Sequence, residues 1–324
     1  MKACIYGAGA IGGWIGSGLA HAGCSVSVLA RGATLDALQL HGLRLHDGKS
    51  ITSQAIASSD TPAELGVQDL VVLAVKAPSL PEVARQIRPL LGPDTLVMTA
   101  MNGVPWWFLQ GFGGVLAGRR LSAVDPDGTL AEALPLHHII GCVVHASCSV
   151  DEPGQVQHHF GKQLIVGEPS GEKTARVQQL ARLLEKAGFE AVVSEQIQKD
   201  IWFKLWGNMT VNPVSALTGA TIDRIMDDEL VRGFISRVML EAKEIGAHLG
   251  IQIDQQPEDR HQITRKLGAV KTSMLQDVEA GKALELDTLV AAVRELGQLT
   301  GVQTPYTDAL LGLARLKARV KGLY

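Results

Sequence analysis

The chain has 324 residues, which is enough for about two domains of ordinary size. It carries 30 Lys and Arg against 33 Asp and Glu, a formal net charge of −3, and no long run of one sign occurs. We therefore do not expect binding of nucleic acid or of a membrane to be its function. With 46% hydrophobic and 19% charged residues, the composition is globular and excludes disordered, collagen-like and low-complexity classes.

The four cysteines, Cys4, Cys24, Cys142 and Cys148, show neither a CxxC pair nor zinc-ligand spacing. A disulfide framework is not expected in a chain of this size, which favours a reducing compartment. The apolar stretch at the N-terminus ends at Gly7, too early for a signal peptide, and no apolar run approaches the roughly 18–20 residues of a membrane span. We expect a cytoplasmic protein without a metal site, and a homodimer is left open.

Strand-like and helix-like segments alternate along residues 1–195, which predicts a parallel, doubly wound α/β sheet of the Rossmann type. The expected strands are 2–6, 25–30, 69–75, 95–99, 139–150 and 163–166. The expected helices are 11–22 and 80–91, and Asp47-Gly48 is expected to form the turn of a hairpin between 43–46 and 51–53.

After about Ser194 the hydrophobic period becomes that of helices. The expected helices are 199–217, 229–249, 286–300 and 306–320. Glycine or proline interrupts the pattern between several of them, as expected of helix ends. We therefore predict an α/β domain over residues 1–195 and an all-α domain over residues 196–324.

A glycine-rich turn follows the first predicted strand and opens the first predicted helix. The turn consists of Gly7, Ala8, Gly9, Ala10, Ile11 and Gly12, the pattern GxGxxG. The first glycine permits a tight turn, the second lets a pyrophosphate approach the backbone, and the third lets the helix pack closely on the strand. The helix N-terminus adds N–H donors for phosphate oxygens. The sequence therefore predicts a dinucleotide site, and the alternative is a glycine-rich turn that binds nothing.

The end of the second predicted strand indicates which dinucleotide is bound. An Asp or Glu there would hold the ribose 2′-hydroxyl of NAD, but the sequence has Arg31 and no acid before Asp36. A guanidinium suits a 2′-phosphate, which it can bind through two parallel hydrogen bonds. This predicts NADP rather than NAD, and the alternative is a solvated arginine at a strand end.

Polar residues also follow the next two predicted strands. Lys76 comes directly after the run 69–75, and Asn102-Gly103 follows 95–99. Ligands of doubly wound sheets gather at the carboxyl ends of the strands, so we expect contacts to cofactor or substrate there. The alternative is a surface lysine and an ordinary Asn-Gly turn.

The first helix of the second predicted domain carries a polar stripe on an otherwise apolar surface. Lys204, Asn208 and Asn212 recur every four residues and therefore share one helix face. Asparagine is a poor helix former, so two of them in one stripe favour a binding role over a merely solvated side.

These motifs together make the chain resemble the 2-dehydropantoate 2-reductase family, also called ketopantoate reductases. The matching segments are GAGAIGG (7–13), LARG (29–32), VKAP (75–78), NGV (102–104), KLWGNMTVNPVSALTG (204–219) and KTSMLQDVEAGKALELD (271–287). The last two segments are far more specific than GxGxxG, because they separate this family from Rossmann enzymes in general.

The resemblance implies a role for each matching residue. Lys204 matches the general acid, and Glu285 matches the acidic residue that engages the substrate and supports catalysis. Asn208 and Asn212 match substrate-positioning asparagines, and Ser273 matches a hydroxyl that contacts the substrate carboxylate. Ser273 and Glu285 also have plainer interpretations, as a helix cap and as a solvated acid.

The resemblance further implies that Asn102 and Lys76 line the cleft for cofactor and substrate, and that the glycine turn and Arg31 bind NADPH. The chain departs from the family pattern at Met101, where the family often has Gln. It departs again at Trp106-Trp107-Phe108, an aromatic cluster in a chain with only 4% aromatic residues. This cluster is expected to line or cover the substrate pocket, or else to be a hydrophobic plug or dimer contact.

The function implied is NADPH-dependent reduction of 2-dehydropantoate to (R)-pantoate by hydride transfer to the 2-keto carbon, a step toward pantothenate and coenzyme A. One alternative is an NADPH-dependent reductase of another small 2-oxo acid on the same fold. The other is a non-catalytic NADPH-binding sensor, which could lose Lys204 or Glu285 without penalty. The presence of both residues favours an enzyme.

Overall fold

The computed structural model describes all 324 residues, which divide into two compact units. Unit 1 comprises residues 1–101 and 129–200, and unit 2 comprises residues 102–128 and 201–324. The sequence placed one boundary after residue 195 and assigned residues 102–128 to the first domain. The structure differs there, because this segment makes its contacts with the helices of unit 2.

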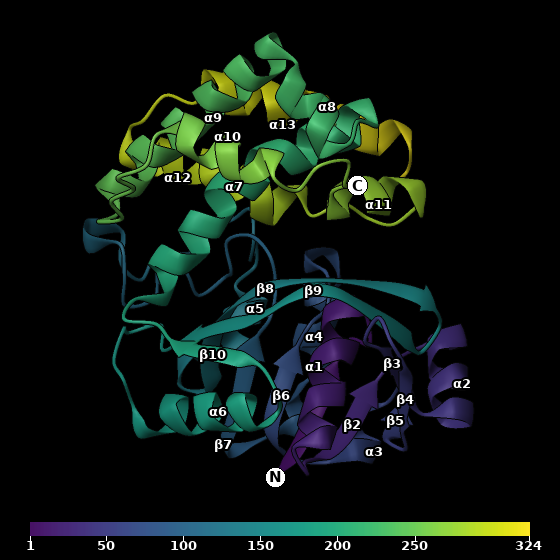
Figure 1. Cartoon of the computed structure of the whole chain (residues 1–324). Coiled ribbons are helices and arrows are strands. Elements are labelled where there is room, and N and C mark those ends of the chain that lie inside the picture. Colours follow the sequence, from purple (N-terminus) through teal and green to yellow (C-terminus); the bar gives the residue numbers. More distant parts are fainter. The chain divides into compact units, whose positions relative to one another are not determined.

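Unit 1 contains all the strands of the protein. They are β1 (Lys2–Tyr6), β2 (Ser25–Leu29), β3 (Leu43–His46), β4 (Ile51–Gln54), β5 (Ala57–Ser59), β6 (Gln68–Leu73), β7 (Leu91–Thr99), β8 (Ile139–Glu152), β9 (Gln155–Gly167) and β10 (Glu190–Val193). They form one sheet in the order β4-β3-β9-β8-β7-β6-β1-β2-β5, with β10 paired to β9 (Figure 1).

The sheet is mixed, whereas the sequence predicted a parallel one with a single hairpin at 43–53. The strands from β5 through β2, β1, β6 and β7 to β8 are parallel as expected, but β8–β9 and β3–β4 are antiparallel. Only Pro153-Gly154 separates β8 from β9, and so short a connection can join only antiparallel strands. Gly154 has φ +71°, a conformation that glycine adopts readily at such a turn.

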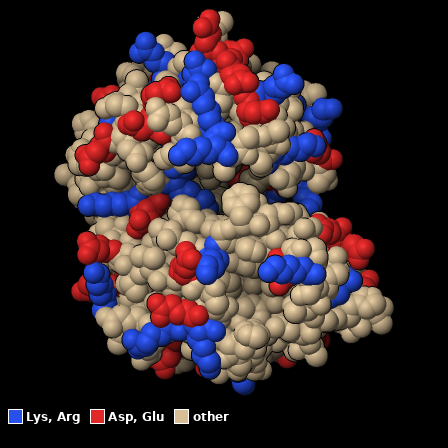
Figure 2. Space-filling view, in the orientation of Figure 1, with Lys and Arg blue, Asp and Glu red and all other residues tan.

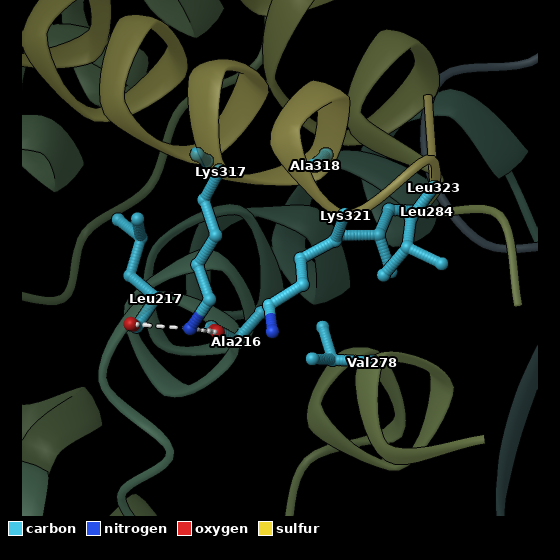
Figure 3. Close-up of a pocket in the computed structure, with 9 residues that line it drawn as sticks. Ala216, Leu217, Val278, Leu284, Lys317, Ala318, Lys321 and Leu323 are labelled. Atoms are coloured by element: carbon cyan, nitrogen blue, oxygen red, sulfur yellow. Dashed lines mark hydrogen bonds between the residues drawn. The ribbon is translucent and has the colours of Figure 1, made fainter. Parts of the chain in front are cut away.

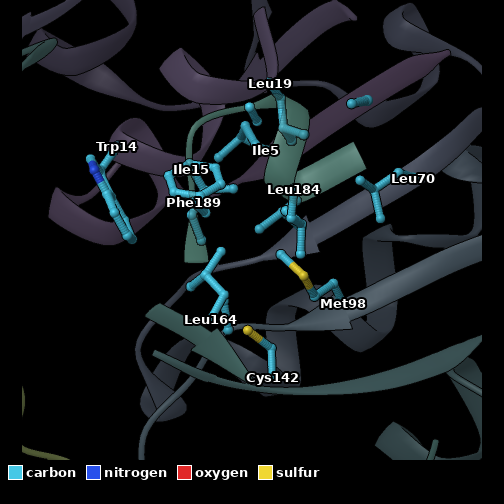
Figure 4. Close-up of a cluster of buried hydrophobic side chains, with 14 of the residues drawn as sticks. Ile5, Trp14, Ile15, Leu19, Leu70, Met98, Cys142, Leu164, Leu184 and Phe189 are labelled. Atoms are coloured by element: carbon cyan, nitrogen blue, oxygen red, sulfur yellow. The ribbon is translucent and has the colours of Figure 1, made fainter. Parts of the chain in front are cut away.

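The helices of unit 1 cover this sheet. They are α1 (Ala10–His21), α2 (Gly32–His41), α3 (Pro62–Leu65), α4 (Leu80–Gln86), α5 (Thr129–Ala133) and α6 (Ala175–Lys186). The main hydrophobic core joins Ile15 and Leu19 of α1 with Leu184 of α6 and with strand residues such as Leu70 (Figure 4). Glycine lets α1 approach closely, since a Cβ on Gly18 would lie 2.4 Å from the Phe189 ring.

The regular secondary structure of unit 2 is helical, while its segment 102–128 consists mostly of turns. Its helices are α7 (Ile197–Thr218), which begins four residues inside unit 1, α8 (Ile222–Asp227), α9 (Glu229–His248), α10 (Pro257–Arg265), α11 (Ser273–Glu279), α12 (Ala292–Thr300) and α13 (Pro305–Val320). A π-helical turn, Asp287–Ala291, leads directly into α12. Trp202 and Trp206 fasten α7 to α9, because their indole N–H groups donate to the carbonyls of Ala242 and Met239 at 3.2 and 2.7 Å.

Residues 102–128 belong to unit 2 through specific contacts. The backbone N–H groups of Ser122 and Ala123 each donate to the Glu295 carboxylate of α12 at 2.8 Å. The Phe108 ring packs on Trp202 of α7, with 5.8 Å between ring centroids. These partners are far away in the sequence, which explains why the sequence pattern assigned the segment to the preceding domain.

Charged side chains of both signs lie on the face drawn in Figure 2. Basic and acidic side chains are interspersed there. None of the helices combines the length and the apolar composition that crossing a membrane requires.

Candidate active site

The glycine turn of unit 1 has the geometry of a phosphate cradle. Gly7 has φ +106°, and a Cβ there would lie 2.8 Å from Val75 Cγ1. A Cβ on Gly12 would lie 2.0 Å from the Gly7 carbonyl oxygen, so the third glycine is required for close packing. A Cβ on Gly9 would meet no atom within 4 Å, and α1 begins just after it without a side-chain cap. The turn therefore leaves open space before the free N–H groups of a helix N-terminus, which fits a pyrophosphate.

Three strand ends meet at one edge of the sheet. Because β1 lies between β2 and β6 and is parallel to both, the glycine turn, Arg31 and Lys76 all follow carboxyl ends on the same side. Lys76 is partly buried and directly precedes the 3₁₀ turn Ala77–Ser79. This is the edge where the sequence predicted the dinucleotide.

Arg31 forms an ion pair with Glu82, a residue that no sequence motif marks. Its Nη1 donates to both carboxylate oxygens of Glu82, each at 2.8 Å, and its side chain is 63% exposed. Glu82 lies in the first turn of α4 and also accepts from Gln86 Nε2 at 3.3 Å. Nothing in the local sequence marks this acid, because residues 31 and 82 meet only through the pairing of β2, β1 and β6.

Unit 2 brings Lys204 and Asn102 together across 102 positions of sequence. Lys204 Nζ donates to Asn102 Oδ1 at 2.8 Å, and both side chains are partly buried. The bond fixes an ammonium on the polar stripe of α7 beside the Asn-Gly turn.

The same turn reaches the segment that carries Glu285. The Val104 N–H donates to the Thr288 carbonyl at 2.8 Å, and a Cβ on Gly103 would lie 2.7 Å from the Thr288 backbone. Glu285 lies one helical turn before Thr288 and is partly buried. Segment 102–104 therefore joins α7 on one side to residues 285–288 on the other.

Asn208 is partly buried, Asn212 is 8% exposed, and neither side-chain amide makes a hydrogen bond with another residue. Ser273 is exposed and is the first residue of α11, so it does not cap the helix. The cap is Thr272, whose hydroxyl accepts from the Leu275 N–H at 3.2 Å. The Ser273 hydroxyl is thus available for another contact.

The aromatic cluster after Asn102 lies in the interior of unit 2. Trp106, Trp107 and Phe108 are 3%, 1% and 0% exposed. Phe108 packs against Phe112 as well as Trp202. Of the interpretations that the sequence left open, this burial favours the hydrophobic plug.

A small pocket elsewhere in unit 2 lies among the end of α7, α11 and α13 (Figure 3). Lys317 Nζ donates there to the carbonyls of Ala216 and Leu217 at 2.7 and 2.6 Å, which satisfies the C-terminal end of α7. None of the candidate site residues lines this pocket. No group of three or more His, Cys, Asp or Glu side chains could hold a metal ion.

A strand–glycine turn–helix unit, followed by a helical unit whose first helix carries a polar stripe beginning at Lys204, is typical of oxidoreductases of the Rossmann class that use a nicotinamide dinucleotide. The particular family follows from comparison with known proteins. The model of the family "Ketopantoate reductase PanE/ApbA" matches residues 3–171, and that of its C-terminal domain matches residues 196–318. The chain belongs to the ketopantoate reductase family.

Relatives cover the whole chain. A 2-dehydropantoate 2-reductase of Mesorhizobium japonicum is 46% identical over 325 aligned residues, 100% of both chains. A solved structure of a candidate ketopantoate reductase from Ralstonia solanacearum is 54% identical, covers 99% of both chains and has a TM-score of 0.94. A D-mandelate dehydrogenase solved with NADH and anilino(oxo)acetate is 22% identical over both full lengths, and its TM-score of 0.86 shows a shared fold.

Proposed function

We propose that this enzyme reduces 2-dehydropantoate to (R)-pantoate with NADPH. The observation that carries the proposal is the hydrogen bond from Lys204 to Asn102. The segment 102–104 also contacts Thr288, which lies three residues after Glu285. It gathers the matching residues of three separate family motifs in one unit. The 46% identity to the Mesorhizobium enzyme over the whole chain supports the same substrate.

The bound nicotinamide would supply the hydride for the 2-keto carbon. Lys204 would donate the proton to the oxygen, and its positive charge would stabilise the alkoxide as it develops. Asn102 would hold the ammonium in place, since its carbonyl oxygen already accepts from it. Glu285, one turn from Thr288, would act beside this pair as the acidic group that engages the substrate.

The remaining polar groups would hold the substrate. Asn208 and Asn212 follow Lys204 at successive turns of α7, and their amides have no partner in the chain. Ser273 offers a hydroxyl that no helix cap uses. Unpaired amide and hydroxyl groups suit the polar ends of a small hydroxylated 2-oxo acid.

NADPH is proposed over NADH because of Arg31. A guanidinium stands after β2, and the glycine turn and Lys76 lie at the same edge. Arg31 is held by Glu82 at 2.8 Å, so a 2′-phosphate would have to displace that carboxylate. Such an exposed ion pair contributes roughly 0–1 kcal/mol, less than a charge-assisted bond to phosphate at about 1.5–3 kcal/mol.

The test is steady-state kinetics of the purified enzyme with 2-dehydropantoate and a series of bulkier 2-oxo acids, each with NADPH and NADH. The proposal expects the highest kcat/KM for 2-dehydropantoate with NADPH. A higher value for another 2-oxo acid would identify a different reductase on the same fold. Tight NADPH binding without turnover of any 2-oxo acid would instead indicate a sensor.

A further inference from the structure

Arg260 of α10 packs directly against the helix that carries Lys204. Its guanidinium lies over the Phe203 ring, 5.3 Å from the ring centroid. A Cβ on Gly207 would lie 2.8 Å from Arg260 Nε and 3.0 Å from Nη2. Because Gly207 has no side chain, the Arg260 guanidinium can contact α7 at this position.

The Arg260 guanidinium forms no ion pair with an acidic side chain. The guanidinium makes no ion pair or hydrogen bond with another residue, and burial lowers the pKa of Arg260 from its ordinary value. The acids on the same helix have other partners: Glu258 lies 3.6 Å from Arg265, and Asp259 accepts from the Gln256 N–H at 2.8 Å. An arginine remains charged under these conditions, and a partly desolvated cation is stabilised by any anion that reaches it.

The position of Arg260 relative to Lys204 follows from helix geometry. Gly207 lies three residues after Lys204 and Asn208 lies four after it, so around the helix the two lie on opposite sides of Lys204. Around the helix, Lys204 therefore lies between Gly207, which Arg260 contacts, and Asn208. In a 2-oxo acid the carboxylate is bonded directly to the keto carbon, so a group that binds it must be a neighbour of the proton donor.

We infer that Arg260 binds the carboxylate of the 2-oxo acid while Lys204 serves the adjacent keto oxygen. The asparagines on the other side of Lys204 would then face the hydroxylated tail of the substrate. The planar guanidinium can form two parallel hydrogen bonds to a carboxylate, and contact with Phe203 and Gly207 holds its orientation in advance. This inference rests on the proposed function and adds a charged group for the carboxylate to the Ser273 hydroxyl that the family resemblance implies.

The decisive experiment compares a charged substrate with a neutral one. Wild type, Arg260→Gln and Arg260→Lys are assayed with 2-dehydropantoate and with its neutral lactone, which keeps the ketone and lacks the carboxylate. Arg260→Gln should raise KM for 2-dehydropantoate about 10–100-fold, as expected for a lost charge-assisted contact, and change lactone turnover less than threefold. Arg260→Lys should restore part of the affinity, because it keeps the charge without the planar fork.

Arg265→Gln is the matched control, since Arg265 lies on the same helix but bonds to the Met226 carbonyl and pairs with Glu258. It should leave both KM values near wild type. Calorimetric titration of pantoate into the NADP⁺ complex gives a second measure, with Kd about 10–100-fold weaker in Arg260→Gln. Thermal unfolding and the Kd for NADPH show whether each variant is folded.

An unchanged KM and pantoate Kd in folded Arg260→Gln would overturn the inference, as would an equal loss on acid and lactone. In either case the wild-type enzyme would still reduce 2-dehydropantoate, so the proposed function would stand. If wild type itself reduces no 2-dehydropantoate and binds no pantoate, the proposed function fails and the inference fails with it.

Discussion

Unit 1 and unit 2 position their functional groups by different means. In unit 1 the proposed phosphate cradle is made of backbone, from a strand, a turn and a helix that are consecutive in the chain. In unit 2 the candidate groups with printed contacts are side chains from α7, α10 and the segments 102–104 and 285–288, which only tertiary contacts bring together. We therefore expect substitutions in unit 1 to change which cofactor binds, and substitutions in unit 2 to change the rate or the substrate.

The largest effect is expected for Lys204→Ala. Loss of a general acid costs about 10²–10⁴-fold in rate, and the ammonium acts mainly on charge that exists in the transition state. The kcat with NADPH should fall by at least 100-fold, while the Kd for NADPH should stay within about tenfold.

Lys199→Ala is a suitable control, because Lys199 lies on the same helix with an exposed side chain. A folded Lys204→Ala enzyme that keeps the wild-type kcat would remove Lys204 from the mechanism. That result would also contradict the expectation that substitutions in unit 2 change the rate or the substrate.

Trp107→Ala tests whether the aromatic cluster belongs to the core or to the substrate pocket. Because the Trp107 side chain is only 1% exposed, its truncation should lower the free energy of unfolding by about 3–5 kcal/mol. The ranking of 2-oxo acids should stay unchanged. Trp107→Phe should cost less, since it keeps an aromatic ring and removes an indole N–H that has no partner. Denaturant unfolding and the substrate series measure the two effects. A changed ranking of the 2-oxo acids would show that the cluster lines the substrate pocket, which is one of the interpretations that the sequence left open.

Arg31→Ala is expected to act on the cofactor alone. The Kd for NADPH should weaken by roughly 10–150-fold, which corresponds to about 1.5–3 kcal/mol, and the Kd for NADH should change little. Fluorescence titration of both cofactors gives the ratio directly, with NADH as the internal control. Equal affinity of the wild-type enzyme for the two cofactors would contradict the proposed preference.

Glu82→Gln should have the smallest effect and the opposite sign. It frees Arg31 from a carboxylate at 2.8 Å and removes an anion from the neighbourhood of the 2′-phosphate. NADPH should bind up to about fivefold more tightly, within the range of an exposed ion pair. Glu190→Gln is the matched control, because Glu190 is an exposed acid of β10 that lies 3.4 Å from Lys162. Weaker NADPH binding in Glu82→Gln alone would mean that the acid helps to position Arg31.

Much of the fold could be predicted from local pattern. The strand at 2–6 was predicted with its observed bounds, the hairpin at Asp47-Gly48 was confirmed, and the long helices of unit 2 were found to within a few residues. The antiparallel pairing of β8 with β9 was not predicted, although the short Pro153-Gly154 connection indicates it. Helices α2 and α6 were missed as well, even though α6 has a regular apolar face that packs on the core.

The sequence by itself determined the glycine turn and the stripe Lys204, Asn208 and Asn212, because both depend on residues a few positions apart and on the period of one element. It also contains the family motif at 271–287, from which the roles of Glu285 and Ser273 are inferred. The tertiary structure alone decided that residues 102–128 join the helical unit, that Glu82 holds Arg31, and that Arg260 rests on Gly207 beside Lys204. These pairs are distant in the chain, and such contacts depend on how helices and strands pack rather than on any pattern of neighbouring residues.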